Sequence, residues 1–483
     1  MPTLEQAFAV ASPRITPRTA PAVSRIIHLF IIVVTIAIFS RIFVSNGIFT
    51  WSAGLTYVLY DTALLVFVTW KTWPLIKTAP NTFAMSPTSS LTKLILGRPS
   101  IGVIIAAYNE VDVLEKTIKA LLLQSDLPAQ IMIADDGSDD GSVELLKQTY
   151  GFSEPVLNQL AAANSHYPNL SWLRVHHQGK AGTLNHAINL LDTDIVITVD
   201  ADTLLNPNAV AEMRAAFCAD NQLVAATGVL SPVCNNTLRG KCLQWFQTYE
   251  YIRNFISRFA WMRADSLLLI SGAFAAFRRD ALLDVGGFDA ACLVEDYELI
   301  HRLRRYSFEQ QRNWQVKVIG SAFAYTSAPS TLIGFLRQRR RWFAGFLQTQ
   351  YWNRDMTGNA RFGKLGLLML PVKTIDTVQP LYGLLAFVLL IYFVGSGALS
   401  LFGAVLSVIG IKIVIDLLFH LWSIFLYQRW TGDRAQSRIL YAIFAAILEP
   451  FSFQLLRHTG AVMGWFYFLT GRQKWGKQQR SAF

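Results

Sequence analysis

Two blocks of apolar sequence, one toward each end of the 483-residue chain, constrain the fold more than any other feature. Residues 26–44 and 48–70 form two apolar runs, and a longer apolar block begins near residue 360. Each of the first two runs is long enough for an α-helix to cross a bilayer. Charged residues make up only 16% of the chain, against about 25% in soluble proteins. The sequence therefore predicts a membrane protein with a water-soluble domain between its membrane helices.

The basic residues indicate which side of the membrane the soluble insert faces. The formal net charge is +11, and much of this excess flanks the apolar runs. The flanking residues are Arg14, Arg18, Arg25, Lys71, Lys77, Arg472, Lys474, Lys477 and Arg480. Because Lys and Arg accumulate in cytoplasmic loops, the N-terminus, the insert and the C-terminus are predicted to be cytoplasmic, and no nucleic-acid partner is expected. Asp61 lies within the second run, where a carboxylate needs a partner.

The C-terminal apolar block predicts several helices. Residues 365–378 carry Lys373 and Asp376 among apolar residues, which predicts a helix lying in the membrane interface. The remaining runs predict spans over 381–394, 401–426, 439–456 and 460–469. The expected total is six spans, with four or five as alternatives. Asp416 and His420 share one face of a span, where they line either a channel or a contact between helices.

The predicted organisation follows from these runs. It comprises a cytoplasmic tail (1–25), two membrane helices (26–70), a linker (71–97), a soluble domain (98–345), an interfacial helix with further membrane helices (346–470) and a basic cytoplasmic tail (471–483). The four cysteines lie in the soluble domain without C-x-x-C spacing, so they are expected to be reduced thiols.

The insert has the pattern of an α/β domain. Short apolar runs at 101–107, 130–134, 170–175 and 195–199 alternate with helix-like stretches such as 113–124 and 142–150. Strands that alternate with helices build βαβ units, so a mostly parallel, Rossmann-like sheet is expected.

Acidic residues follow the strand predicted at 195–199. Asp200 and Asp202 are two residues apart, so both side chains point to the same side and can converge on one cation. Mg²⁺ prefers such oxygen ligands and commonly bridges them to substrate phosphates. A solvated strand end with a helix cap is the alternative.

Two further strands are predicted to end in polar groups at the same edge of the sheet. Tyr108 and Glu110 follow the first, and Asp135 and Asp136 follow the second. A tyrosine ring and a carboxylate suit a nucleobase, although Asp136-Gly137-Ser138 is also ordinary turn chemistry. Lys180 lies in a Gly-rich loop before a helix, where a cation suits phosphate. The insert lacks P-loop spacing and a G-x-G-x-x-G turn after a strand, so nucleotide hydrolases and dinucleotide oxidoreductases are disfavoured.

The end of the insert contains two more polar groups. Glu295 and Asp296 open an amphipathic helix, where they are either dipole partners of the helix or a base for an acceptor hydroxyl. Arg341 and Trp342 precede the membrane, where they are either a basic juxtamembrane stop or an arginine for diphosphate beside an aromatic platform for sugar.

The order of these motifs resembles processive family-2 glycosyltransferases, in particular poly-N-acetylglucosamine synthases, with cellulose and hyaluronan synthases as relatives. The motifs are Tyr108-Asn109-Glu110, Asp135-Asp136-Gly137, Lys180-Ala181-Gly182, Asp200-Ala201-Asp202, Glu295-Asp296 and Gln338-x-x-Arg341-Trp342. They cover about residues 95–345. Val294 replaces the usual threonine before Glu295, which leaves the acidic pair in place.

The resemblance implies a GT-A-like domain and a role for each motif. Tyr108, Glu110, Asp135 and Asp136 would bind uracil and ribose, Lys180 the diphosphate, and Asp200 with Asp202 a Mg²⁺ or Mn²⁺ ion. Asp296 would be the general base. Gly272, Glu295, Gln338, Arg341 and Trp342 would position donor and acceptor.

The expected function is transfer of a hexose or N-acetylhexosamine from a UDP-sugar to a growing polysaccharide, with inversion and with export through the membrane helices. The predicted location is the inner (plasma) membrane, with the lipid bilayer as a partner and accessory subunits possible. The alternatives are a non-processive transferase to a lipid acceptor and a transporter with a nucleotide-binding domain.

Overall fold

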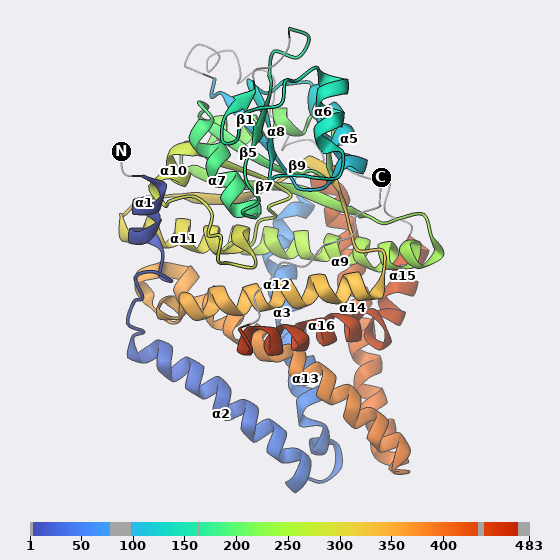
Figure 1. Cartoon of the computed structure of the whole chain (residues 1–483). Coiled ribbons are helices and arrows are strands. Elements are labelled where there is room, and N and C mark those ends of the chain that lie inside the picture. Colours follow the sequence, from blue (N-terminus) through green and yellow to red (C-terminus); the bar gives the residue numbers. More distant parts are fainter. Residues whose placement is uncertain (1–2, 78–97, 162–164, 433–438, 472–483) are drawn as a thin grey trace.

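The computed structural model describes residues 3–77, 98–161, 165–432 and 439–471 (Figure 1). Most of the predicted linker at 71–97 and of the basic tail at 471–483 therefore lies outside the described residues. An α/β domain lies at one end of the molecule, and the long apolar helices extend from its other side. This arrangement confirms the predicted α/β domain flanked by apolar helices.

A nine-stranded sheet forms the centre of the α/β domain, in the order β3-β4-β2-β1-β5-β8-β7-β9-β6. The strands are β1 (Ile101–Ala107), β2 (Gln130–Asp135), β3 (Leu160–Ala161), β4 (Leu170–Arg174), β5 (Ile195–Asp200), β6 (Thr203–Leu205), β7 (Leu223–Val233), β8 (Phe274–Arg278) and β9 (Gln315–Ser327). The prediction of a mostly parallel sheet holds for β4, β2, β1 and β5. It is wrong at β8, which enters antiparallel to both β5 and β7, and at the edge strands β3 and β6, which are antiparallel to β4 and β9, whereas β7 and β9 are again parallel.

The register of the parallel strands brings their polar ends together. Ala107 of β1 lies opposite Asp135 of β2, and Ala106 lies opposite Asp200 of β5. The strands are rich in β-branched residues and are almost fully buried, as expected for a sheet covered on both faces. The carboxyl ends of these strands form one edge, where open α/β sheets bind ligands.

Helices connect the strands and separate the sheet from the membrane part. They are α5 (Val111–Leu122), α6 (Ser142–Tyr150), α7 (Lys180–Leu190), α8 (Ala209–Ala219), α9 (Leu238–Arg263), α10 (Arg279–Asp284), α11 (Glu295–Glu309) and α12 (Leu332–Trp352). Helix α9 contacts the sheet on one side and α3 (Ser52–Thr72) and α14 (Leu399–Thr431) on the other. In Figure 1, α9 and α12 run crosswise to these membrane helices.

Four helices of the described chain are long and apolar enough to cross a membrane: Ala22–Val44, Gly47–Ile76, Leu365–Gly395 and Leu401–Thr431. They contain α2 (Ala22–Val44), α3, α13 (Leu370–Gly395) and most of α14. A fifth span results only if α15 (Ile439–Leu448) and α16 (Phe453–Leu469), bent by 47° at a break, are one unit. The prediction of six spans is therefore wrong for the described residues, and so is the separate interfacial helix at 365–378, which continues into α13.

The bend before α16 has a local cause and a packing consequence. Pro450 lies at the break and supplies no backbone N–H to continue a helix. Beyond it, α16 runs beside α12 and crosswise to the spans (Figure 1). Gly460 and Gly464 permit this approach, since a Cβ atom at either position would lie within 3.0 Å of an α12 atom. Most of the segment predicted as a final membrane hairpin (439–469) therefore belongs to α16, which packs against α12.

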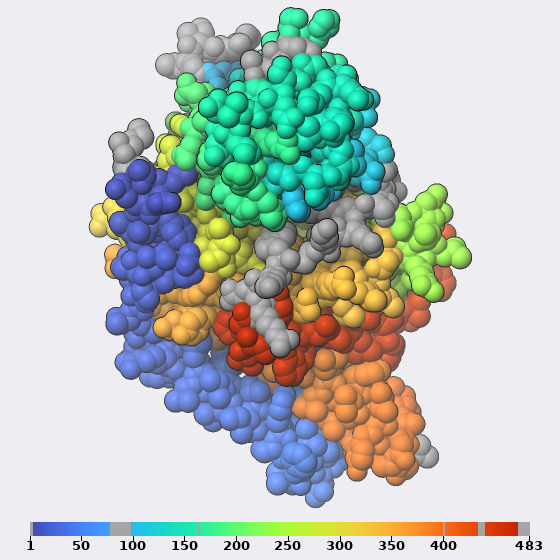
Figure 2. Space-filling model, in the orientation of Figure 1, coloured from blue at the N-terminus to red at the C-terminus, as the bar shows by residue number. Residues whose placement is uncertain are grey.

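The N-terminal residues predicted as a tail contain a docked helix, α1 (Leu4–Ala11). It lies on the side of the α/β domain, shown in dark blue in Figure 2. Arg14 donates two hydrogen bonds to the buried Asp289, at 2.7 and 2.8 Å. Gly286 has φ +80°, and a Cβ there would lie 2.2 Å from the backbone nitrogen of Phe8. The N-terminus is thus fixed against the segment that leads to α11.

Candidate active site

A cleft of about 530 Å³ lies between the carboxyl edge of the sheet and helices α9, α11, α12 and α13. Many of the predicted site residues line it: Lys180, Asp200, Asp202, Gly272, Glu295, Asp296, Gln338, Arg341 and Trp342. The structure thus brings into one cleft residues that are more than 160 positions apart in the sequence. Their chemical roles remain predictions.

Lys180 links two of the acidic residues. Its Nζ lies 2.5 Å from Oδ1 of Asp200, at the end of β5, and 3.3 Å from Oε1 of Glu295, at the start of α11. Burial by itself would lower the pKa of Lys180, but the carboxylates of Asp200 and Glu295 outweigh it and raise the pKa. The site therefore holds a permanent cation between two carboxylates.

Glu295 is the more deeply buried of the two acidic residues that open α11. Burial raises its pKa, and the nearby Asp296 raises it further, while Lys180 opposes both effects. The adjacent carboxylates are thus held in different environments, because Asp296 is only partly buried and lines the cleft. Such a difference between paired carboxyl groups is typical of sites that move protons.

Asp296 is held in place by backbone N–H groups. Its Oδ2 accepts a hydrogen bond from the backbone nitrogen of Gly272 at 2.7 Å, and its Oδ1 accepts one from its own successor, Tyr297, at 2.8 Å. A Cβ atom at Gly272 would lie 3.1 Å from both Cβ and Oδ2 of Asp296. Glycine at position 272 therefore permits the close approach that orients this carboxylate.

The fit of a divalent cation depends on Asp200 and Asp202. Both line the cleft, and the ammonium of Lys180 already occupies one carboxylate oxygen of Asp200. Within the described ranges, no group of three or more His, Cys, Asp or Glu side chains is arranged to hold a metal ion. Mg²⁺ commonly needs only one or two carboxylates when substrate phosphates complete its coordination. The two aspartates therefore fit a cation that arrives with a phosphorylated ligand.

The residues predicted to bind uracil and ribose lie at the same sheet edge but do not line the cleft. Tyr108 stacks on His177, with ring centroids 4.1 Å apart. Glu110 precedes α5 directly. Asp135 accepts a hydrogen bond from the backbone of Ser138, and burial raises its pKa.

Asp136 holds the loop that carries Lys180. Its carboxylate accepts hydrogen bonds from the backbone nitrogens of Gln178 (2.8 Å) and Gly179 (3.0 Å) and from the hydroxyl of Thr183 (2.8 Å). Both oxygens of Asp136 are engaged in this way, and Oδ2 also lies 2.8 Å from Nδ1 of His177. Partners of this kind are not visible in a linear motif.

Sequence reasoning missed the part of the cleft formed by α9. Tyr251, Asn254, Arg258 and Trp261 all line it. Their spacing of three and four residues places them on one face of a helix, so helical periodicity is the signal that could have found them. Arg457 and His458 of α16 complete the cleft next to the membrane helices.

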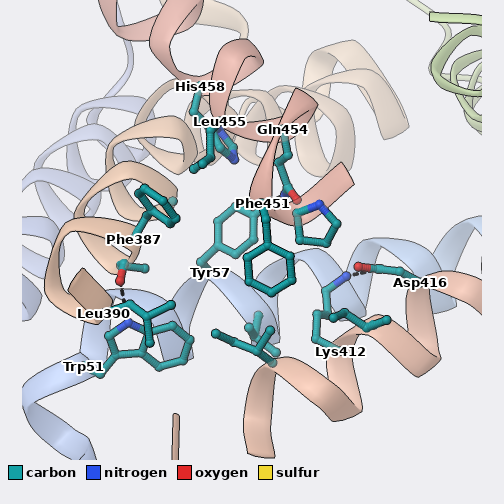
Figure 3. A pocket seen from close by; sticks show the side chains of 16 residues that line it. Trp51, Tyr57, Phe387, Leu390, Lys412, Asp416, Phe451, Gln454, Leu455 and His458 are labelled. Carbon is teal, nitrogen blue, oxygen red and sulfur yellow. Dashed lines mark hydrogen bonds and ion pairs between the residues drawn. The ribbon is translucent and has the colours of Figure 1, made fainter. Parts of the chain in front are cut away.

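A second cavity, of about 90 Å³, lies among the membrane helices (Figure 3). Its lining combines aromatic side chains, including Trp51, Tyr57 and Phe451, with the polar groups Lys412, Asp416, Gln454 and His458. His458 lines both this cavity and the cleft. The two hollows therefore meet at one side chain.

Three charged side chains within the membrane helices pair with one another. Lys412 contacts Asp61 of α3 at 2.7 Å and also forms an ion pair with Asp416, one turn along α14. The expectation that Asp61 needs a partner is confirmed. Asp416 lines the cavity, whereas His420 packs against Tyr249 of α9, with ring centroids 4.9 Å apart. Of the two residues that were predicted to share one face of a span, Asp416 thus lines the cavity and His420 lies in a contact between helices.

Comparison with known proteins identifies the family and agrees with the fold. A model of the family described as glycosyltransferase like family 2 matches residues 99–345. The chain therefore belongs to this family of sugar-transferring enzymes. The four cysteines of the domain are free thiols, as the sequence predicted.

The chain is similar to poly-β-1,6-N-acetyl-D-glucosamine synthases. It is 30% identical over 244 residues to that of Staphylococcus aureus, which covers 50% of this chain and 53% of the relative. It is 28% identical over 289 residues to that of Staphylococcus epidermidis, which covers 59% of this chain and 64% of the relative. The matches thus span about half to two thirds of these relatives.

A solved structure shares the fold. The mannosyltransferase of Pyrobaculum calidifontis, determined in complex with GDP-mannose and Mn²⁺, superimposes with a TM-score of 0.52 and 16% sequence identity. The superposition covers 83% of this chain and 99% of that protein. The prediction of a GT-A-like fold is confirmed.

Proposed function

We propose that the protein is a membrane-embedded inverting glycosyltransferase that extends a polysaccharide from a UDP-sugar. The observation that carries this proposal is the cleft in which Lys180 bridges Asp200 and Glu295 beside Asp296. It combines a cation suited to diphosphate with a carboxylate suited to take a proton, next to the membrane helices. The similarity to poly-N-acetylglucosamine synthases favours an N-acetylhexosamine over a hexose as the transferred sugar.

The reaction would be a single displacement. The acceptor hydroxyl oxygen forms a bond to the anomeric carbon, while the bond between that carbon and the diphosphate breaks. The proton of the hydroxyl passes to Asp296, which the backbone nitrogens of Gly272 and Tyr297 hold in position. Lys180 stabilises the negative charge that develops on the departing diphosphate. Because Asp296 acts only as a base, no covalent sugar–enzyme intermediate forms.

Asp200 and Asp202 would hold a Mg²⁺ or Mn²⁺ ion. When bound, this ion would neutralise charge on the diphosphate. Tyr108, Glu110 and Asp135 would contribute to the nucleoside side, and Asp136 would fix the loop of Lys180.

The helices next to the cleft support processive transfer and export. Gln338, Arg341 and Trp342 of α12 line the cleft and would position donor and acceptor. The cavity that meets the cleft at His458 offers aromatic and polar side chains along an exit route (Figure 3). The catalytic domain would lie on the cytoplasmic side of the inner membrane, in agreement with the basic flanks of the apolar runs. Accessory subunits are compatible with this arrangement.

Purified protein, a panel of UDP-sugars and Mn²⁺ test the proposal. Metal-dependent UDP release with a lengthening product is the expected result, and N-acetylglucosamine is the expected sugar. Release of UDP with only single-sugar products would favour transfer to a lipid acceptor. No UDP from any donor would remove the enzymatic function and leave a transporter with a nucleotide-binding domain.

A further inference from the structure

The wall of the cleft formed by α9, α12 and α16 contains polar atoms without hydrogen-bond partners. Among the described residues these atoms include Nε and Nη1 of Arg258, Oε1 of Gln338 and Nε2 of His458, all of them buried. All three side chains line the cleft. A buried polar atom without a partner costs free energy, so such a group indicates a missing ligand or solvent. Side chains of this kind from three different helices in one cleft indicate a surface that a polar ligand completes.

Of the three side chains, Arg258 has the greatest need of a partner, because it is charged and two of its buried nitrogen atoms have no hydrogen-bond acceptor among the described residues. Burial lowers its pKa to about 10, which still leaves the guanidinium charged at neutral pH. Its one recorded contact through the guanidinium is with the ring of Phe255, whose centroid lies 4.6 Å from Cζ. The part of the chain covered by the structure supplies no ion pair or hydrogen bond to it. A buried arginine normally has both, as Arg302 does with Glu298.

The electrostatic neighbours of Arg258 indicate the part of the cleft that it serves. The carboxylate whose charge acts on it is that of Asp296. Asp200 and Glu295, in contrast, pair with Lys180. These two cations of the cleft are thus divided among its carboxylates: Lys180 serves the end of β5, and Arg258, one of several arginines that line the cleft, serves the side of Asp296 that faces α9.

We propose that Arg258 binds the acceptor saccharide, donating hydrogen bonds to oxygen atoms of the terminal sugar whose hydroxyl Asp296 deprotonates. This inference rests on the proposed function, because it takes Asp296 as the proton acceptor. A guanidinium has five N–H donors in a fixed fork, which suits the hydroxyl and N-acyl oxygens of a sugar. It is a further acceptor-binding residue, outside the motifs that identify the family.

The surroundings of Arg258 agree with a sugar as its ligand. Tyr251 and Trp261 of the same helix and Trp342 of α12 line the cleft with it. Aromatic faces beside hydrogen-bond donors are the usual combination for binding a sugar ring, which has apolar faces and polar edges. Because Arg258 is on α9 and Trp342 is on α12, the acceptor would lie between two helices that run crosswise above the membrane helices (Figure 1).

The test uses the full-length protein, with Arg258→Gln to remove the charge and Arg258→Lys to keep the charge without the fork. Arg263→Gln is the matched control, since Arg263 is exposed near the end of the same helix and does not line the cleft. The probes are UDP and a pentasaccharide of β-1,6-linked N-acetylglucosamine. Binding of each is measured separately, by calorimetry and by the rise in Tm.

We expect Arg258→Gln to weaken pentasaccharide binding about 10- to 100-fold, the usual effect of losing a hydrogen bond to a charged group. UDP affinity should stay within about 2-fold, and acceptor-dependent kcat/KM should fall by a factor similar to the loss of saccharide affinity. Arg258→Lys should show a smaller loss. Removal of an unpaired buried charge should leave Tm unchanged or higher.

Three results would overturn the inference. The first is a loss of UDP affinity with saccharide binding intact, which would assign Arg258 to the donor. The second is no change in either affinity. The third is a large fall in Tm with both affinities lost, which would assign a packing role. Saccharide binding needs no turnover, so failure of the wild type to release UDP would count against the proposed function and not against this inference.

Discussion

The two walls of the cleft differ in how their polar groups are satisfied. On the wall formed by the sheet edge, Lys180 is bound to two carboxylates, and Asp136 holds its loop through three hydrogen bonds. On the wall formed by the helices, buried atoms of Arg258, Gln338 and His458 have no hydrogen-bond partner in the described chain. On the sheet wall the charge of Lys180 is paired before any ligand binds, whereas on the helical wall these three side chains are left with unpaired atoms.

The difference has a physical origin. Parallel strands end at one edge in a fixed register, so a few side chains can satisfy one another there before any ligand binds. Helices that cross beneath the sheet have no such register, and their side chains project into the space that separates them. Under the proposed function, the preorganised wall stabilises the same diphosphate in every cycle, whereas the helical wall receives a saccharide that moves after each transfer.

The largest effect is expected at Asp296, which lies between the two walls. Asp296→Asn should lower transfer by about 10³- to 10⁴-fold, since the amide cannot accept the proton, at the upper end of the range for general-base loss. UDP affinity should stay within a few-fold, because the sheet wall is unchanged. UDP release and calorimetry measure the two effects. Equal losses in both would show that the walls are not independent.

Measurements of thermal stability compare Arg302, which is paired, with Arg258, which is not. Arg302 lies on α11 and is fully paired with Glu298, at 2.6 and 2.9 Å. Arg302→Met should destabilise the domain by about 3–5 kcal/mol by leaving a buried carboxylate alone. Arg258→Gln, which breaks no pair, should cost little. Thermal unfolding in detergent compares them, and Glu298→Leu combined with Arg302→Met should recover much of the loss. Equal destabilisation by Arg258→Gln and Arg302→Met would contradict the contrast.

The sheet wall is tested at Asp200. Asp200→Asn removes a partner of Lys180 and one proposed cation ligand, so Mn²⁺-dependent UDP affinity should fall by about 10- to 100-fold. Calorimetry with and without Mn²⁺ measures the change. Saccharide binding, which belongs to the helical wall, should not change. If the effect of Mn²⁺ on UDP affinity survives in Asp200→Asn, the cation site lies elsewhere.

The stability of the protein at acid pH tests the packing of α11, the helix that carries Asp296. His301 on α11 is fully buried, and burial lowers its pKa to about 3. The unfolded chain takes up a proton near pH 6.5 and the folded chain does not, so stability is lost as the pH falls below this value. The loss should reach about 2 kcal/mol at pH 5. His301→Gln should flatten this dependence, and the exposed His176→Gln should not. An unchanged pH slope would show that other groups cause the loss.

The smallest effect is expected at Gly272. An alanine Cβ would lie 3.1 Å from the Oδ2 atom of Asp296, so the carboxylate must shift by a few tenths of an ångström. Transfer should fall about 10-fold, because small displacements of a catalytic group slow the reaction, with UDP binding intact. The rate of transfer by the Gly272→Ala variant, measured at a saturating concentration of donor, gives the size of this effect. Full activity would mean that the orientation of Asp296 does not depend on this contact.

The sequence predicted the parallel part of the sheet closely. The runs at 101–107 and 142–150 agree residue for residue with β1 and α6. Strands of this kind are identified by local composition, because burial on both faces requires a continuous apolar run. The sequence failed where long-range packing decides, as in α16, which packs along α12 where the second helix of a membrane hairpin was predicted. Hydropathy alone cannot separate these outcomes, since both bury apolar side chains.

The same division applies to the candidate site. Asp200, Asp202 and Asp296 could be named from spacing, because the geometry of a strand end or a helix start is local. Arg258 could not, since nothing in its neighbourhood along the chain shows that its guanidinium is buried without a partner.

By itself, the sequence determined the membrane-flanked α/β architecture and named part of the set of acidic and basic groups that line the cleft, among them Lys180, Asp200 and Asp296. Only the tertiary structure decided which of those groups are already satisfied, that α1 docks on the domain, and that α9 provides a wall of the site. Periodicity along a chain fixes which side chains share a face, but the partner of that face depends on elements far away in the sequence. That partner determines whether a charge stabilises the fold or remains available to a substrate.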